Sequence, residues 1–198
     1  EVEAAGADSI TIHLRQDRRH IQDADVYELR EKIHTLLNLE MGNTAEILEI
    51  ALEVKPAFVC LVPENRKEIT TEGGLDVAGS VSALRDTVSA LRENGTRVSL
   101  FVDPDPRQLE AGADTGAEMV ELHTGAYCDH HADGETATRD AELARLSDGA
   151  KRAADLGVEV HMGHGLTYDT VGPIAALPEV AELNIGHFLM GEAVFVGL

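Results

Sequence analysis

Residues 10–20, ITIHLRQDRRH, begin as a buried strand and end as a polar loop. Apolar and polar side chains alternate from Ile10 to Leu14, which is the period of a β-strand. The loop that follows concentrates positive charge in four side chains: Arg15, Arg18, Arg19 and His20. We therefore predict a positive pocket at the carboxyl end of a strand, which is where α/β folds place their functional residues.

The chain has 198 residues, of which 43% are hydrophobic and only 4% aromatic. A chain of this length forms one sizeable core, so we predict a single domain over residues 1–198 with an aliphatic core. No apolar run reaches about 18 residues, the length that crosses a bilayer. The first residues, EVEAAGAD, are too acidic and polar for a signal peptide. Two cysteines without a CxxC motif fit a reducing compartment, and we predict a cytoplasmic protein.

The formal net charge is −20, because 36 Asp and Glu residues face only 16 Lys and Arg. Such an excess of negative charge argues against nucleic acids and anionic membranes as partners. Only 4 of the 16 basic residues are lysines. A carboxylate-rich, lysine-poor surface is typical of proteins from a high-salt cytoplasm, where salt screens self-repulsion, and we hypothesise such an origin.

Strand-like and helix-like patterns alternate along the whole chain. The predicted strands are Ser9–Leu14, Leu36–Leu39, Phe58–Val62, Val98–Val102, Met119–His123, Val158–Met162 and Glu182–Ile185. The predicted helices are Asp23–Thr35, Thr44–Val54, Val81–Asn94, Pro104–Thr115, Glu135–Leu156 and Tyr168–Leu177. Asp23, Thr44 and Asp103 are the expected N-caps, and Gly95, Gly116 and Gly157 the glycines that end helices. This alternation predicts a parallel sheet with right-handed crossovers.

Seven strands are one short of a (β/α)₈ barrel. The opening residues EVEAAGAD are similar to the end of a helix running into a strand, as in residues 114–119. We therefore expect a TIM barrel truncated to about seven strands, with its first strand and its last helix absent.

Polar residues stand where each predicted strand ends. They include His13, Glu40, Thr70, Asp103, Glu121, His123, His161, His164, Asn184, Gly186 and His187. Taken alone, a histidine at a strand end is usually a structural hydrogen-bond partner, and Asp103 is most simply a helix cap. In a barrel, however, all these ends meet at one rim, so their convergence predicts a catalytic site.

Three local features suggest chemistry at that rim. Glu40 follows an apolar strand without a nearby basic residue in sequence, so desolvation should raise its pKa toward that of a general base. The glycines beside His164 and before His187 are suited to a phosphate site, although they could serve tight turns alone. A zinc site among His123, Cys128, His130 and His131 is the weaker alternative, because their spacing matches no standard pattern; we predict no metal.

Eight motifs occur in an order that resembles the pyridoxine 5′-phosphate synthase family. They are ITIHLRQDRRHIQDADV, NLEM, KPAFVCLVPE, TTEGGLDVAG, VSLFVDPD, VELHTGAY, GHGLTYD and ELNIGH. The resemblance covers essentially the whole chain. It implies a (β/α)₈ barrel that condenses 1-deoxy-D-xylulose 5-phosphate with 3-amino-2-oxopropyl phosphate, releasing phosphate and water. It implies neither a metal nor an organic cofactor, and it implies a homo-oligomer.

The resemblance also implies roles for individual residues. His13 and Glu40 would accept protons, and His164 would donate one. The deoxyxylulose phosphate would be bound by Arg15, His20 and Thr70. The aminooxopropyl phosphate would be held by Gly165, Gly186 and His187. Glu121 would lie in the same pocket without an assigned role.

The family's first strand carries an Asn-x-Asp-His motif that is missing from this chain. We therefore expect this chain to be inactive or nearly so, and a truncated barrel acting only as an assembly subunit remains an alternative. Another phosphate-binding barrel, such as a Schiff-base aldolase or a thiamine phosphate synthase-like protein, is a second alternative. A Schiff-base aldolase needs a lysine at a strand end, and Lys32, Lys55, Lys67 and Lys151 are not placed there.

Overall fold

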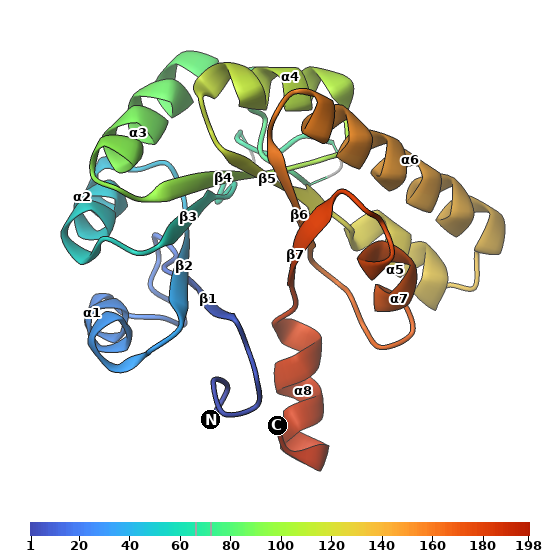
Figure 1. The fold of residues 1–198 in the computed structure, drawn as a ribbon, viewed down its shortest axis with the longest axis horizontal. Helices are drawn as coiled ribbons and strands as arrows, with labels where there is room; N and C mark the ends of the chain where they lie inside the picture. Colours follow the sequence, from blue (N-terminus) through green and yellow to red (C-terminus); the bar gives the residue numbers. More distant parts are fainter. Residues whose placement is uncertain (66, 72) are drawn as a thin grey trace.

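The computed structural model describes residues 1–65, 67–71 and 73–198. Within these residues, seven parallel strands pair in chain order as one curved sheet, and the helices that connect the strands lie around its convex side (Figure 1). The strands are β1 (Ser9–His13), β2 (Leu36–Met41), β3 (Phe58–Leu61), β4 (Arg97–Val102), β5 (Met119–His123), β6 (Glu159–Gly163) and β7 (Val180–Asn184). This arrangement confirms the prediction of a barrel-type α/β fold with about seven strands.

Eight helices connect or follow the strands within the described residues. They are α1 (Asp23–Lys32), α2 (Ala45–Val54), α3 (Val81–Glu93), α4 (Pro106–Thr115), α5 (Gly125–Ala132), α6 (Thr136–Asp155), α7 (Val171–Ala175) and α8 (His187–Val196). The sequence pattern missed α5, whose residues read as a polar loop. A ten-residue helix, α8, also follows Gly186, whereas we expected the last helix to be absent.

The two faces of the sheet differ in polarity. Leu39, Leu61 and Leu100 are fully buried in the aliphatic core that includes residues of the surrounding helices. Because side chains alternate along a strand, the neighbouring residues face the concave side, and these are largely polar. Asn38, Ser99, Glu121 and His161 are all buried there. The sheet therefore has an apolar shell and a polar interior, which is an unusual interior for a barrel core.

Polar side chains connect the first and last strands across the concave side. The Asn38 amide donates to Thr11 Oγ1 at 3.3 Å, and Thr11 Oγ1 donates to Asn184 Oδ1 at 2.9 Å. The Asn184 amide in turn donates to Glu121 Oε2 at 3.0 Å. β1 and β7 are not paired through their backbones in the described sheet, so these side chains hold the two ends of the curved sheet together.

Two predicted helix caps are wrong. Asp105, not Asp103, caps α4, and its carboxylate accepts from the backbone N–H groups of Arg107 and Gln108. The sequence 103–106 reads Asp-Pro-Asp-Pro, so either Asp-Pro pair satisfied the rule for a cap followed by proline. Gln22 rather than Asp23 caps α1, whereas Thr44 caps α2 as predicted.

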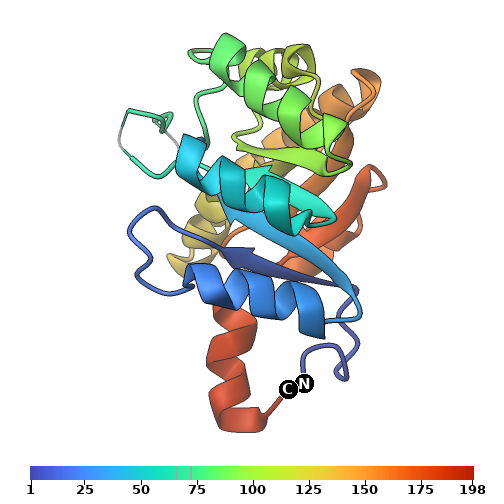
Figure 2. The same ribbon diagram turned by 90° about the vertical axis from the view of Figure 1, so that its left-hand side faces the viewer.

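The apolar residues of helix α8 are spread around the helix, and α8 packs only loosely against the rest of the chain. None of its residues is buried, and Val194 and Phe195 are 80% and 85% exposed. In both views it projects from the end of β7, near the N-terminal segment, and the two chain termini lie close together (Figures 1 and 2). Among the described residues, no helix combines the length and the apolar character needed to cross a membrane.

Candidate functional site at the carboxyl ends of the strands

The predicted site residues gather at one end of the sheet because parallel strands all finish on the same side. His13 is the last residue of β1, and Glu40 lies opposite it on β2 in the strand register. His123 ends β5, and His164 follows β6 directly. Glu40 lies inside β2 rather than after it, because the strand continues to Met41.

The His13 imidazole lies between two carboxylates. Its Nδ1 is 3.6 Å from Glu40 Oε2, and its Nε2 is 3.1 Å from Glu64 Oε1. Both His13 and Glu40 have side chains that are 24% exposed. His13 and Glu40 are therefore neighbouring titratable groups that a substrate can reach at the mouth of the sheet.

The carboxyl groups beneath this rim hold protons unusually strongly. Burial raises the pKa of Glu40, and the nearby His13 only partly offsets this effect. Burial, together with repulsion from Glu40 and Glu182, raises the pKa of Glu121 to about 8. Glu121 is completely enclosed, next to the Cys60 thiol at 3.9 Å and the Asn184 amide at 3.0 Å. Near neutral pH, Glu121 is therefore a neutral acid at the base of the site.

A second group of side chains surrounds His164. Its ring lies 4.8 Å from the ring of His123 and 6.1 Å from that of Phe101. His123 Nδ1 is 3.6 Å from Asp103 Oδ1, and Asp103 also accepts a hydrogen bond from the Thr70 hydroxyl. Burial raises the pKa of Asp103, but its bonds to His123 and Thr70 outweigh this effect, so the pKa lies below its usual value.

His164 is held in an unusual backbone conformation. Its φ is +79°, in the left-handed region that residues other than glycine rarely adopt. The buried Thr124 hydroxyl is 2.8 Å from the carbonyl oxygen of Gly163 and 2.7 Å from that of His164, and it supports this turn. Partial desolvation lowers the pKa of His164, and the neighbouring His123 and His187 lower it further. Strained backbone of this kind is common at functional sites.

The predicted positive pocket is smaller than the sequence indicated. Arg18 pairs with Asp23 and Glu46, and Arg19 pairs with Asp17, so both guanidinium groups are neutralised at the surface. Arg15 lies 3.6 Å from Asp17 but keeps a buried Nε without a hydrogen-bond partner. His20 is exposed in the same loop. Arg15 is thus the arginine of this group that is best placed to receive an anion.

The glycine-rich turns lie at the ends of β6 and β7. Gly165 has a φ of +86°, which favours glycine, and a Cβ there would lie 3.2 Å from the Cβ of Cys128. Gly186 is the N-cap residue of α8, and His187 is the first residue of that helix. A helix N-terminus favours anions. Gly186 and His187 are both exposed, so an anion could reach this turn.

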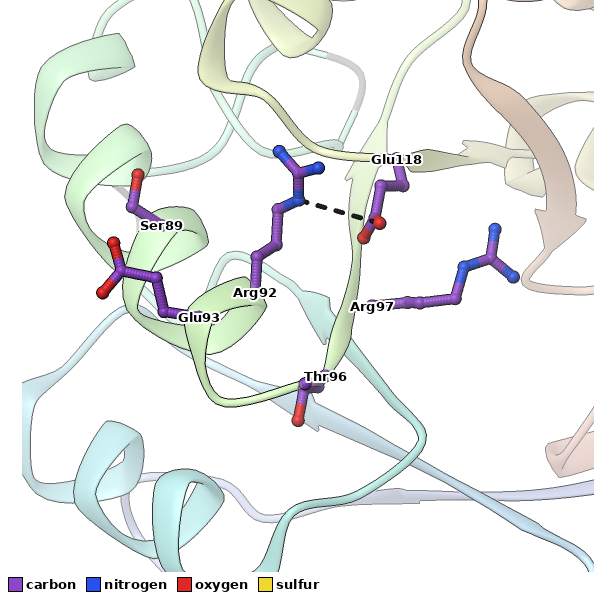
Figure 3. Close-up of a pocket in the computed structure, with 7 residues that line it drawn as sticks. Ser89, Arg92, Glu93, Thr96, Arg97 and Glu118 are labelled. Atoms are coloured by element: carbon purple, nitrogen blue, oxygen red, sulfur yellow. Dashed lines mark ion pairs between the residues drawn. The ribbon is translucent and has the colours of Figure 1, made fainter.

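One surface hollow lies away from this site. Figure 3 shows a cavity of about 460 Å³ lined by residues that include Ser89, Arg92, Thr96, Arg97 and Glu118, near the amino ends of β4 and β5. Its arginines are already paired, with Arg92 3.7 Å from Glu118 and Arg97 3.1 Å from Glu159. It lies at the opposite end of the strands from His13 and His164, so we do not assign it to the reaction.

The alternative zinc site is not assembled. In the described parts of the chain, no three histidine, cysteine or acidic side chains converge as metal ligands. His130 instead lies 2.8 Å from Glu135 on the surface, and Cys128 packs near Thr170 in the interior.

The sequence motifs do not indicate a role for Glu64, although one of them, KPAFVCLVPE, ends at this residue. Glu64 lies three residues beyond β3, and nothing in the sequence indicates that its side chain reaches across β2 to β1. The signal was limited to an acidic residue that follows a strand and a proline. His123 was noticed as a strand-end residue, but its contact with His164 depends on the fold.

Comparisons with known proteins find relatives over nearly the whole chain. A family model described as pyridoxal phosphate biosynthesis protein PdxJ matches residues 1–198. A relative from Jannaschia sp. (strain CCS1), named pyridoxine 5′-phosphate synthase, is 61% identical over 196 residues, which cover 99% of this chain and 79% of the relative. A relative from Rhodospirillum rubrum with the same name is 59% identical over 194 residues, 98% of this chain and 77% of the relative.

Solved structures support the fold alone, because their sequences are distant. A 3-keto-L-gulonate-6-phosphate decarboxylase from Vibrio cholerae has a TM-score of 0.63 at 14% identity, covering 92% of this chain and 78% of that one. A phosphoribosyl anthranilate isomerase from Thermus thermophilus has a TM-score of 0.59 at 16% identity, with the same coverage.

Proposed function

Because this chain belongs to the pyridoxine 5′-phosphate synthase family of vitamin B6 biosynthesis, we propose that its rim of histidines and carboxylates condenses two phosphorylated substrates. The substrates are 1-deoxy-D-xylulose 5-phosphate and 3-amino-2-oxopropyl phosphate, and the products are pyridoxine 5′-phosphate, inorganic phosphate and water. The chemistry consists of imine formation, elimination of water and of inorganic phosphate, and C–C bond formation that closes the ring, and acid–base groups promote each of these steps by moving protons.

In this proposal, His13 and Glu40 accept protons, and His164 donates one. The contact between His13 Nδ1 and Glu40 Oε2 at 3.6 Å carries the assignment, because it joins two titratable groups at a site that a substrate can enter. The raised pKa of Glu40 and the lowered pKa of His164 bring the two groups toward each other on the pH scale. Such groups pass protons in both directions near neutral pH.

Two phosphorylated substrates require two anion sites. Arg15, His20 and Thr70 would bind the deoxyxylulose phosphate, and the buried Nε of Arg15, which lacks a hydrogen-bond partner and lies 3.6 Å from Asp17, supports that placement. Gly165, Gly186 and His187 would hold the aminooxopropyl phosphate beside the N-terminus of α8.

The test is replacement of Glu40 by Gln. We expect turnover, measured as phosphate released from the two substrates, to fall by about 10²- to 10⁴-fold, the usual contribution of a general acid or base. Binding of inorganic phosphate, measured by calorimetry, should stay close to wild type because Glu40 is not part of either anion site. Glu49→Gln is the control. It makes the same substitution at an exposed position on α2 and should leave turnover unchanged. Wild-type turnover in Glu40→Gln would remove Glu40 from the mechanism.

The assay is run on two proteins, since the chain spans 77–79% of the length of the relatives compared above. One is the 198-residue chain, and the other carries an additional strand with the Asn-x-Asp-His motif ahead of Glu1. Turnover in the extended protein alone fits the expectation from the sequence that this chain is nearly inactive. Turnover in neither would refute the reaction we propose.

The aldolase alternative is weaker. Lys32 and Lys151 lie on α1 and α6, Lys55 follows α2, and Lys67 lies in the loop after β3, and all four are exposed. A Schiff-base lysine needs a desolvated position close to the reacting carbonyl.

We also propose that the protein acts in the cytoplasm as a homo-oligomer. The exposed apolar side chains of α8 support association, because contiguous apolar patches on a protein surface commonly mark contact sites.

A further inference from the structure

Glu64 is a carboxylate with an unusual number of partners for a loop residue. Its side chain is 7% exposed. Oε1 lies 3.1 Å from His13 Nε2 and accepts from the Gly42 N–H at 3.2 Å, while Oε2 accepts from the Gln16 N–H at 2.8 Å. These partners come from the end of β1, the loop after it and the end of β2. A single side chain from the loop after β3 therefore fastens together three segments of the rim.

The close packing at Gly42 shows that the Glu64 side chain occupies one defined position. A Cβ at position 42 would lie 3.0 Å from both Cγ and Cδ of Glu64. The backbone N–H of Glu64 donates to Glu68 Oε2 at 3.0 Å, which fixes the start of the loop. The contact with Gly42 and the bond of its own backbone N–H therefore position Glu64 independently of its contact with the His13 imidazole.

The contact with Glu64 determines which nitrogen of His13 carries the hydrogen. An ionised carboxylate only accepts hydrogen bonds, and a neutral imidazole has one N–H. Both oxygens of Glu64 already accept from backbone N–H groups, so Glu64 is set to accept from His13 as well. The hydrogen of neutral His13 then lies on Nε2, and Nδ1 keeps a free lone pair facing Glu40 at 3.6 Å.

We propose that Glu64 is a positioning residue that holds neutral His13 as the Nε2–H tautomer and so makes Nδ1 the basic nitrogen of the site. The inference rests on the proposed function only for the role of Nδ1, which is to accept a proton from the substrate. Glu64 itself does not touch the reacting atoms.

The tautomer can be read directly by ¹⁵N NMR of protein labelled at its histidine side chains, at a pH where imidazoles are neutral. The resonances of His13 are assigned by their loss in His13→Gln. In the wild type we expect the shift of a bare nitrogen for Nδ1 and that of a protonated nitrogen for Nε2. In Glu64→Gln, which is isosteric but no longer a charged acceptor, we expect both tautomers to be populated.

Glu68→Gln is the matched control. Glu68 lies in the same loop and bonds to Glu64 N, Asn65 N and the Asn65 side chain, with no contact to His13 among the described bonds. The side-chain amide oxygen in Glu68→Gln can still accept from the Glu64 N–H, so this variant should keep the wild-type tautomer. Circular dichroism establishes that all variants are folded. A wild-type His13 with its hydrogen on Nδ1, or a Glu64→Gln protein with an unchanged tautomer, would overturn the proposal.

Kinetics on a protein that turns over both substrates provide the second readout. We expect kcat to fall by about 10²-fold in Glu64→Gln, because correct acid–base catalysis is commonly worth that much, and to remain unchanged in Glu68→Gln. The expected NMR result without turnover in any protein would refute the proposed function but not the role of Glu64. Turnover with an unchanged tautomer in Glu64→Gln would refute the role of Glu64 alone.

Discussion

Glu121 shows how a single residue can link the site to the stability of the fold. Its side chain is completely buried among polar neighbours, and its pKa is raised to about 8. In the unfolded chain, a glutamate titrates near pH 4.3. Between these two pH values the native state holds a proton that the unfolded state has lost. The free energy of unfolding therefore falls as the pH rises through this window.

Replacing Glu121 by Gln should remove that dependence. We expect the free energy of unfolding of the variant, relative to wild type, to rise between about pH 5 and pH 8 by up to ~1.4 kcal/mol per pH unit. Urea denaturation at several pH values measures the difference. Glu28→Gln, which removes an exposed carboxylate on α1, serves as the control and should run parallel to wild type. Parallel curves for Glu121→Gln would mean that Glu121 is ionised in the native protein.

At this scale, the sequence predicts a residue's position better than its contacts. His13, Glu40 and His164 could be placed at the rim because each lies at or near the end of an apolar run, and parallel strands end together. Glu64 could not be placed in this way, since a loop side chain has no periodicity to fix its direction. Asp103 was misassigned because helix capping and site chemistry favour the same residue type.

At the level of elements, helix α4 illustrates how one cap releases another residue for the site. Asp105 accepts from the N–H groups of Arg107 and Gln108, and Pro106 begins the helix. Asp103 is then free to accept hydrogen bonds from Thr70 and from the Gly74 N–H. Strand and helix order could be predicted from periodicity and glycines, whereas α5 could not, because its residues Gly125–Ala132 lack an apolar stripe.

The cap can be tested by mutation of Asp105. We expect Asp105→Ala to lower the free energy of unfolding by about 1 kcal/mol, the usual cost of losing an N-cap side chain. Asp86→Ala is the control, because Asp86 is exposed within α3 and alanine is the better helix former. Chemical denaturation measures both variants. Equal free energies of unfolding in the two variants would show that the Asp105 side chain does not stabilise the start of α4.

On the scale of the whole molecule, two features oppose each other. The chain carries a formal net charge of −20, which makes copies of it repel one another. Helix α8 nevertheless exposes Leu189, Met190, Val194, Phe195 and Val196 together. An apolar helix that buries none of its own residues cannot be explained by the packing of this chain alone. The negative charge could be predicted from the sequence. The exposure of α8 could not, because it depends on the direction in which the chain leaves β7.

If α8 meets a second copy, association should depend on salt. The Debye length falls from about 10 Å at 0.1 M salt to about 3 Å at 1 M, which screens the repulsion between copies. We therefore expect sedimentation to show an oligomer whose dissociation constant decreases as KCl increases. Phe195→Asp should leave the protein monomeric at every salt concentration, because it places a charge within the apolar contact. Tyr27→Asp, which adds the same charge at an exposed aromatic on α1, should assemble like wild type. Equal assembly of the Phe195 and Tyr27 variants would show that α8 is not the contact between copies.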